Sequence, residues 1–213
     1  MFLKSIRNGR FQIISSYVIH TEKSTTPLSK GTTSFKSSIM VTCRKLTEQK
    51  TAYFEDITPQ TEDKIKFMLD KISTKKLFDI QMTDLLIMVA GKVLETCTQF
   101  TELKSYDKNF EPDFKTLIKD SHDFIMRELV VKLTGRNMNL IGPEMAFYLL
   151  VRIFYNGKIT GDGSIQITRA VDVDLKKLEN AGVVKDVGGD KNLIPLQETN
   201  LELKPEELDS ANL

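Results

Sequence analysis

The sequence predicts an α+β protein in which helices predominate. Three observations carry this prediction: two β-type segments lie near the N-terminus, four helical segments follow, and a short helix-plus-hairpin pattern comes last. With 213 residues, 40% of them apolar, and nearly balanced charge, the chain can form a packed core and is not disordered, collagen-like or polycationic. We expect four parts, over residues 1–50, 51–157, 158–197 and 198–213.

The N-terminal part is predicted to be an antiparallel β-hairpin with a basic insertion. Phe11–His20 is rich in β-branched and aromatic residues, and Ser38–Arg44 alternates apolar and polar side chains. The segment between them, Thr21–Lys36, is too polar to pack and is expected to form a long exposed loop.

Helical periodicity begins at Thr58, the expected N-cap, with Pro59 at the first helical position. Thr83 is expected to cap a second helix that runs to about Phe100. A third helix is expected over Pro112–Thr134 and ends at Gly135, and a fourth runs from Pro143 to Asn156-Gly157. The fourth helix is apolar nearly all round, which places it at the centre of its bundle.

The last part resembles a small winged-helix-like module. Short helical stretches are expected at Ile167–Ala170 and at Asp174–Ala181, followed by strands Val183–Val187 and Asn192–Leu196 around Gly188-Gly189-Asp190. Gly161-Asp162-Gly163 is interpreted as a turn, because no predicted hydrophobic strand precedes it and no predicted helix begins at it. The tail, Gln197–Leu213, is acidic and low in apolar residues, and we expect it to be frayed.

Charge is concentrated in the first quarter of the chain. Residues 1–50 hold nine Lys/Arg against Glu22 and Glu48, a net charge of +7, which leaves −6 for the remainder. Clustered cations favour an anionic partner such as the DNA backbone, and a merely solvated surface is the alternative. The candidate nucleic-acid-binding residues are Arg7, Arg10, His20, Lys23, Lys30, Lys36, Arg44 and Lys45.

The residues offer little support for other chemistry. Cys43 and Cys97 cannot form a disulfide framework or a four-cysteine metal site, and we expect two reduced, buried thiols and no metal. His122 lies on an apolar stripe and is interpreted as a structural, hydrogen-bonded histidine. No segment is apolar enough to span a membrane, and no signal peptide is recognised, so we expect a cytoplasmic protein.

The order of several motifs resembles the C-terminal portion of the large adenine-specific DNA methylases of prokaryotes. These motifs are Asn8-Gly9-Arg10-Phe11-Gln12-Ile13, His20-Thr21-Glu22-Lys23, Ser37–Lys45, Thr83-Asp84-Leu85-Leu86 with Ala90–Glu95, and the region from Val173 to Leu196. In that family the two strands close the catalytic sheet as an antiparallel pair. The resemblance therefore implies a fragment or split part of an N6-adenine methyltransferase of the restriction-modification kind.

The same resemblance implies that this chain is not catalytically competent alone. The family's cofactor, S-adenosylmethionine, binds at a glycine-containing turn, and an Asp-Pro-Pro-Tyr-type loop holds the adenine; the sequence has neither motif. We therefore expect no catalytic or cofactor-binding residues here, and an upstream polypeptide that carries the catalytic half as partner. A stand-alone helical, winged-helix-like DNA-binding or regulatory module is the alternative, and a purely structural interaction protein is the third.

Overall fold

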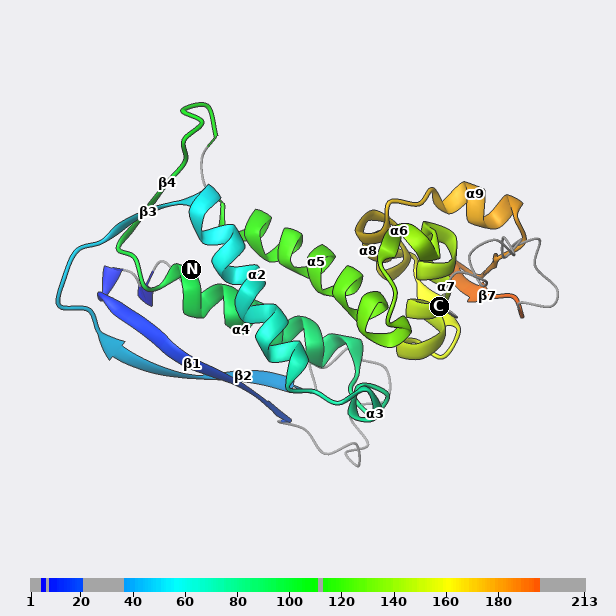
Figure 1. Cartoon of the computed structure of the whole chain (residues 1–213), viewed down its shortest axis with the longest axis horizontal. Coiled ribbons are helices and arrows are strands. Elements are labelled where there is room, and N and C mark those ends of the chain that lie inside the picture. The colour runs from blue at the N-terminus through cyan, green and yellow to red at the C-terminus, as the bar shows by residue number, and fades with distance from the viewer. Residues whose placement is uncertain (1–4, 7, 21–36, 111–112, 196–213) are drawn as a thin grey trace, which may run out of the picture. The chain divides into compact units, whose positions relative to one another are not determined.

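The computed structural model describes residues 5–6, 8–20, 37–110 and 113–195. It has the predicted α+β character, with helices predominating and an antiparallel hairpin at the N-terminal end (Figure 1). The chain divides into two compact units: unit 1 comprises residues 1–72 and 80–122, and unit 2 comprises 73–79 and 123–213. Each unit is described by itself below.

The hairpin of unit 1 pairs strand β1 (Phe11–His20) with strand β2 (Ser37–Lys45) in antiparallel register. The register runs from Phe11 opposite Lys45 to His20 opposite Ser37, with a bulge between Ile13 and Ser15. The prediction of both strands and of their pairing is confirmed. The expected loop over 21–36 and the expected tail over 197–213 lie outside the described residues.

Two helices and a short parallel strand pair complete the core of unit 1. Helix α2 spans Phe54–Asp70 and helix α4 spans Met82–Cys97, while strand β3 (Thr51–Tyr53) pairs with strand β4 (Glu102–Lys104). A buried apolar cluster joins these elements through Ala52, Ile57, Val93, Cys97 and Leu117. The strands β3 and β4 were not expected, because three-residue strands leave no usable periodicity.

Helix α2 begins at Phe54, five residues before the predicted first helical residue Pro59, and Tyr53 is its N-cap, so the prediction of Thr58 as N-cap is wrong. Pro59 lies inside the helix, where the Thr58 hydroxyl donates to the carbonyl of Phe54. The additional turn is held by tertiary contacts: the Glu55 carboxylate accepts hydrogen bonds from the Ser105 hydroxyl and the Tyr106 amide. Acidic groups in a first helical turn are also favoured by the helix dipole.

The predicted N-cap of α4 is wrong by two residues, because Gln81 takes the N-cap position in place of Thr83.

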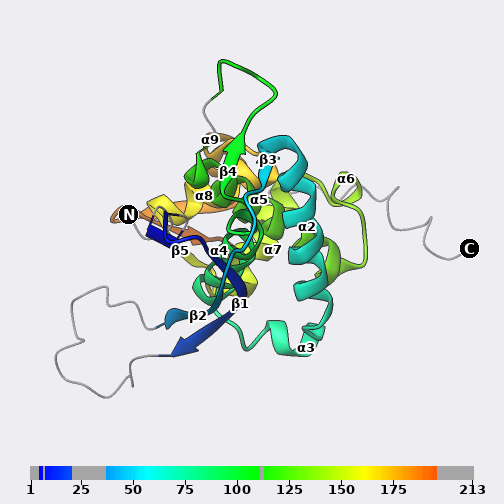
Figure 2. The ribbon, with the colours of Figure 1, turned by 90° about the vertical axis from the view of Figure 1, so that its left-hand side faces the viewer.

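Helix α4 lies between the hairpin and α2. It contacts β1 and β2 on one side and α2 on the other, as Figures 1 and 2 both show. The approach of β1 is close at Gly91, where an added Cβ would lie 2.3 Å from the Ser16 hydroxyl oxygen and 3.1 Å from the Ile39 Cδ1. A glycine is needed there, because any side chain would occupy the space of the strand.

The helices of unit 2 follow the predicted order with two additions. Helix α5 (Phe114–Thr134) begins in unit 1 and continues into unit 2, ending at Gly135 with a positive φ, as expected. Helix α7 spans Pro143–Phe154 and buries Phe147, Leu150 and Val151, which agrees with its predicted central position. Short helices α3 (Thr74–Leu77) and α6 (Met138–Ile141) also belong to this unit and were not predicted.

The end of unit 2 combines two helices with a three-stranded antiparallel sheet of order β5-β7-β6. The elements are β5 (Lys158–Thr160), α8 (Gly161–Val171), α9 (Leu175–Asn180), β6 (Val184–Val187) and β7 (Asp190–Leu193). The interpretation of Gly161-Asp162-Gly163 as a turn is wrong, because these residues form the first turn of α8, with the Thr160 hydroxyl accepting from the Gly163 amide.

Two further boundaries differ from the sequence prediction. Helix α8 is longer than the expected stretch around residues 167–170, and β7 begins at Asp190 in place of Asn192. Only Gly188 and Gly189 form the turn between β6 and β7, and both have positive φ, which suits a two-residue hairpin. In the part of the chain that is described, no helix has the length and apolarity to cross a bilayer.

Candidate nucleic-acid interface

The described part of the predicted basic surface lies at one end of the hairpin. Arg10 precedes β1 in a left-handed conformation with φ of 55°, and its carbonyl accepts a 2.7 Å hydrogen bond from the Leu46 amide. Arg44 and Lys45 end β2, and Lys45 pairs with Phe11 next to Arg10. The hairpin register therefore brings three of the predicted cations, separated by more than thirty positions in the sequence, to one end of the sheet.

The other predicted contact residues cannot be placed in this interface. Arg7, Lys23, Lys30 and Lys36 lie outside the described residues. The backbone of His20 ends β1, opposite Ser37, and its side chain lies outside the description. The structure thus tests the clustering of Arg10, Arg44 and Lys45 alone.

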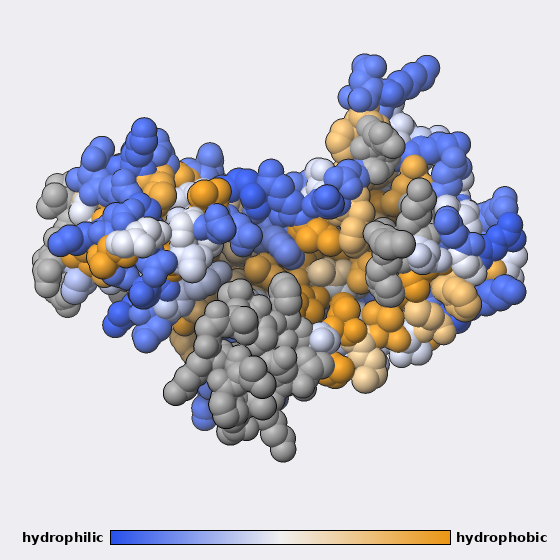
Figure 3. Space-filling model, turned by 180° about the vertical axis from the view of Figure 1, so that it is seen from behind, coloured by the Kyte–Doolittle hydropathy of each residue, from blue (hydrophilic) through white to orange (hydrophobic). Residues whose placement is uncertain are grey.

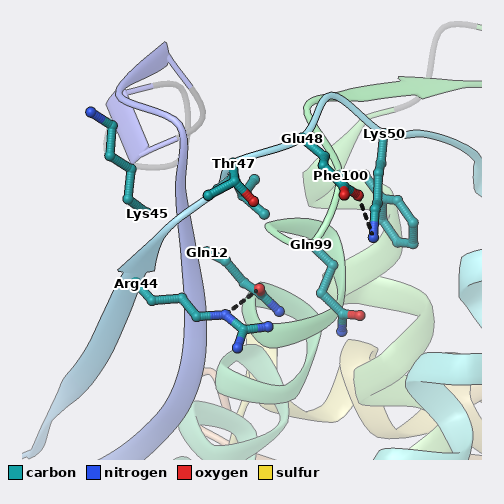
Figure 4. Close-up of a pocket in the computed structure, with 9 residues that line it drawn as sticks. Gln12, Arg44, Lys45, Thr47, Glu48, Lys50, Gln99 and Phe100 are labelled. Carbon is teal, nitrogen blue, oxygen red and sulfur yellow. Dashed lines mark hydrogen bonds and ion pairs between the residues drawn. The ribbon is translucent and has the colours of Figure 1, made fainter.

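A pocket of about 570 Å³ opens beside Arg44 and Lys45 (Figure 4). Its wall comes from β1, from β2 and the segment after it, and from the residues after the end of α4: Gln12, Arg44, Lys45, Leu46, Thr47, Glu48, Lys50, Gln99 and Phe100. Three cations against one carboxylate give the lining a net charge of +2. We call this the hairpin-base pocket.

Arg44 is held in place by its neighbour across the hairpin. Its Nε donates a 3.0 Å hydrogen bond to the Gln12 side-chain oxygen, and Gln12 is its partner in the strand register. Figure 4 shows the guanidinium turned toward Gln12 and Gln99, while Lys45 points away from them. Arg44 therefore offers its remaining N–H groups to the pocket, and Lys45 offers its charge to the surroundings.

The opposite wall is built on the end of helix α4. Gln99 donates from Nε2 to the Glu95 carbonyl at 3.0 Å, and Phe100 packs against the buried apolar cluster of unit 1 while it also lines the pocket. The Thr101 amide donates a 2.8 Å hydrogen bond to the Lys50 carbonyl, which fixes the two segments to each other. Lys50 forms a 3.4 Å ion pair with Glu48, and both side chains are more than half exposed.

The hairpin is fastened to α4 by polar contacts at two levels. The Ile13 amide, at the bulge, donates a 2.8 Å hydrogen bond to the Thr98 hydroxyl. Three residues further along the strand, the Ser16 hydroxyl donates a 2.5 Å hydrogen bond to Glu95 Oε1, which also accepts from Lys92 Nζ at 2.7 Å. Because Ile13 and Thr98 are buried, these bonds determine how the pocket's two walls meet.

Lys64 on α2 contributes a second cation near this carboxylate. Burial lowers the pKa of Lys64, and the charge of Lys92 lowers it further, while Glu95 opposes both effects. Glu95 therefore faces two lysines and one serine hydroxyl at the packed side of the hairpin. This cluster is structural in character, since it joins three elements within the interior of unit 1.

Sequence reasoning predicted two of the nine lining residues, Arg44 and Lys45, and four of those it missed contribute a cation, amide groups or an aromatic ring. Lys50 was counted in the basic N-terminal quarter and was not assigned a role, although it lies only five residues after Lys45. Gln12 lies opposite Arg44 in the register that the structure shows, and the strand prediction by itself did not fix this pairing. Gln99 and Phe100 carry no local signal, because their proximity to β2 depends on the packing of α4 against the hairpin.

Two lysines of the helix-plus-hairpin end of unit 2 form ion pairs within this module. Lys191 on β7 donates to Glu179 and to Asp186, both at 2.6 Å, and its side chain is only 12% exposed. These bonds, to Asp186 first and Glu179 second, raise the pKa of Lys191, and the bond from Lys191 lowers the pKa of Asp186. Lys158 pairs with Asp190 at 3.1 Å. The β-hairpin of unit 2 therefore presents little unpaired positive charge from these residues.

The cysteines and the described histidine agree in part with expectation. Cys97 is buried as predicted, whereas Cys43 is exposed, which corrects the prediction of two buried thiols; it lies on β2 next to Arg44. His122 is partly buried with Nε2 3.2 Å from the Leu86 carbonyl oxygen, as a structural histidine should be. Across the described ranges, no group of three or more His, Cys, Asp or Glu side chains is arranged to hold a metal ion.

Comparisons with protein-family models, with curated proteins and with solved structures found no match for this chain.

Proposed function

We propose that this chain is the C-terminal part of an adenine-specific DNA methyltransferase, where it contacts the DNA backbone and acts as a scaffold. The observation that carries the DNA-contact proposal is the set of cations at one end of the hairpin: Arg44 and Lys45 line the hairpin-base pocket, and Arg10 precedes Phe11, the register partner of Lys45. Phosphate neutralisation is the most direct use of such a cluster, since each lysine or arginine that pairs with a phosphate releases a bound counterion.

The scaffold part of the proposal rests on the motif order and on the hairpin. The antiparallel pairing of β1 with β2 is what the closing strand pair of a methyltransferase sheet requires. The helix with Thr83-Asp84-Leu85-Leu86 and the later helix-plus-hairpin region follow in the order that the resemblance implies.

A partner polypeptide is proposed from the state of the hairpin surface. Among the described strands, β1 and β2 pair only with each other, so each has an outer edge with backbone groups available for another strand. The face turned away from α4 carries Ile14, Tyr17 and Met40, each about half exposed, and apolar residues are visible on this side in Figure 3. We propose that an upstream catalytic polypeptide covers this surface and binds S-adenosylmethionine, and that both work in the cytoplasm.

A stand-alone winged-helix-like DNA-binding module is the second candidate, and one observation favours it. The support is the element order α7, β5, α8, α9, β6, β7, with β7 between β5 and β6, which is the order that a winged-helix-like module would need. Its charge argues against groove reading, because Lys191 and Lys158 are paired with carboxylates of the same module. We therefore place the DNA contact at the hairpin-base pocket.

The test is the salt dependence of DNA binding by the full chain and by three double variants, each of which removes two cations. Arg44→Met with Lys45→Met removes two cations at the pocket, and Lys115→Met with Lys119→Met removes two exposed cations from α5. The first variant should reduce the slope of log affinity against log salt by about two for duplex DNA, and the second should leave it unchanged. An equal effect of both variants, or loss only on Lys176→Met with Lys177→Met, would transfer the interface away from the pocket.

A separate measurement tests the proposal that this chain does not bind the cofactor by itself. Calorimetric titration of the purified chain with S-adenosylmethionine should give no saturable heat, because the sequence has neither the cofactor turn nor the Pro-Pro-aromatic loop. Saturable, tight binding would contradict the proposed division of labour. Identification of a catalytic polypeptide whose methylation activity rises on addition of this chain would support it.

A further inference from the structure

We propose that the hairpin-base pocket binds one unpaired nucleotide of a DNA strand, with the base in the pocket and the flanking phosphates on the cations at its rim. This inference rests on the proposed DNA contact and goes further, because it names the form of DNA that the site selects. It is drawn from the lining of the pocket, which combines charge, amide groups and an aromatic ring.

The shape of the site separates it from a simple duplex-backbone contact. Side chains that contact the phosphates of a duplex project from a protein surface, whereas this site is a pocket of about 570 Å³. That volume falls in the range of pockets that enclose small organic ligands. A base that remains paired and stacked inside a duplex cannot enter it, so the strand must present a nucleotide that is free of its partner.

The Arg44 guanidinium is oriented toward the pocket before any ligand binds. The bond from its Nε to Gln12 holds one edge of the guanidinium, and the outer N–H groups remain turned to the pocket (Figure 4). A planar guanidinium recognises two acceptors side by side, as found on base edges and on phosphate. Since the side chain is already oriented, little rotamer entropy is lost when the ligand binds.

Phe100 supplies the surface on which a base can stack. It is partly buried and packs against the apolar cluster that contains Val93, Cys97 and Leu117, so the ring is held by the core of unit 1. Stacking on an aromatic ring tolerates any base, because every base has a π-face. The pocket should therefore depend on the presence of a base more than on its identity.

The amides and the outer cations complete the site. Gln12 and Gln99 each carry a donor and an acceptor group, which suits base edges that expose both. Lys45 points away from these residues, and Lys50 lies on the far side beside Glu48 (Figure 4). The cations thus flank the pocket on two sides, where the phosphates that precede and follow an inserted nucleotide would lie. The Glu48 carboxylate is neutralised by its ion pair with Lys50.

The experiment compares three DNA ligands of equal length by fluorescence anisotropy with the full chain. They are a single strand of mixed sequence, the corresponding duplex, and a single strand in which the central nucleotides are abasic. The abasic strand keeps every phosphate, so the electrostatic contribution to binding is preserved while stacking is lost. We expect the normal strand to bind about tenfold more tightly than the abasic strand, and more tightly than the duplex.

Two variants assign this preference to the pocket. Phe100→Leu keeps an apolar side chain against the core and removes the ring, and it should bring the ratio of normal to abasic affinity close to one. Phe67→Leu is the matched control, because Phe67 is 64% exposed on α2 and does not line the pocket. Arg44→Met is a second pocket variant that leaves the core unchanged, and it should weaken the normal strand more than the abasic strand.

The outcomes separate this inference from the proposed function. Equal, salt-sensitive binding of all three ligands would overturn the inference and leave the backbone contact standing, whereas no binding of any ligand would overturn both. A free mononucleotide that competes as well as the same nucleotide within a strand would assign the pocket to small nucleotides and overturn the strand assignment. If Phe100→Leu and Arg44→Met both kept the higher affinity for the normal strand over the abasic strand, the base would bind outside the hairpin-base pocket.

Discussion

The Ser16 hydroxyl donates a 2.5 Å hydrogen bond to Glu95, across a contact so close that Gly91 can carry no side chain. This relationship fastens the hairpin to helix α4 at the level where strand and helix approach most closely. Because Gln12 and Arg44 extend from the hairpin, and Gln99 and Phe100 follow α4, the same contact controls the geometry of the hairpin-base pocket. Damage to it should change both stability and ligand binding.

Gly91→Ala should lower the free energy of unfolding by about 1–2 kcal/mol, measured by urea denaturation. In an unobstructed helix the same change would raise stability by up to about 1 kcal/mol, so the sign of the effect reports the clash with Ser16. In a Ser16→Gly background the substitution should become neutral or stabilising, since the nearest obstructing atoms belong to the Ser16 side chain. Additive effects of the two changes would contradict the close approach.

Glu95→Gln should destabilise the chain by about 1–3 kcal/mol, because it removes the charge that Lys92 meets at 2.7 Å in a side chain only 10% exposed. The glutamine amide has nearly the same shape and can still hydrogen bond to Ser16. The loss of stability therefore measures the effect of the charge alone. Glu102→Gln is the control, since its ion pair with Lys104 is more than half exposed and should change stability by less than about 0.5 kcal/mol. Equal losses in both variants would argue against a special role for Glu95.

Lys64→Met should flatten the rise of stability with pH on the alkaline side. Burial lowers the pKa of Lys64 in the folded chain, so the unfolded chain binds more protons between that lowered pKa and the ordinary value of 10.5. Stability therefore increases as pH rises through this interval, and the methionine removes that contribution. Urea midpoints measured from neutral pH upward, with Lys119→Met as an exposed control, should show a smaller slope only for the Lys64 variant.

Tyr155, which follows α7, should ionise well after an ordinary tyrosine, because burial raises its pKa from 10.0 to about 12. The folded chain holds this proton more tightly than the unfolded chain, so the corresponding stability is present below pH 10 and is lost as pH rises through about 12. In a phenolate absorbance titration, Tyr155→Phe should reduce the late-ionising component, to which Tyr106 also contributes because its hydrogen bond to Asp56 raises its pKa. If the substitution instead reduced the phenolate absorbance that develops near pH 10, Tyr155 would ionise like an exposed tyrosine, and its burial would be contradicted.

The regular elements of the chain follow closely from local patterns. Strand β1 and its pairing with β2 are predicted by β-branched residues and alternation, and Gly135 and Gly157 end their helices with positive φ as their positions suggest. Gly161-Asp162-Gly163 shows the limit of such reasoning. Two glycines in three residues are typical of a turn, yet the Thr160 cap and the packing of Ile167 and Ala170 make them the start of α8.

The sequence by itself determined the hairpin, the main helices and the charge of the N-terminal quarter, because these depend on propensity, periodicity and composition over short windows. Only the tertiary structure decided that Arg44 shares a pocket with Gln99 and Phe100, and that α2 gains a turn from Ser105 and Tyr106. Each of these contacts joins residues about fifty positions apart. Such contacts depend on how α4 packs between the hairpin and α2, and on a glycine at position 91 small enough to let the strand approach.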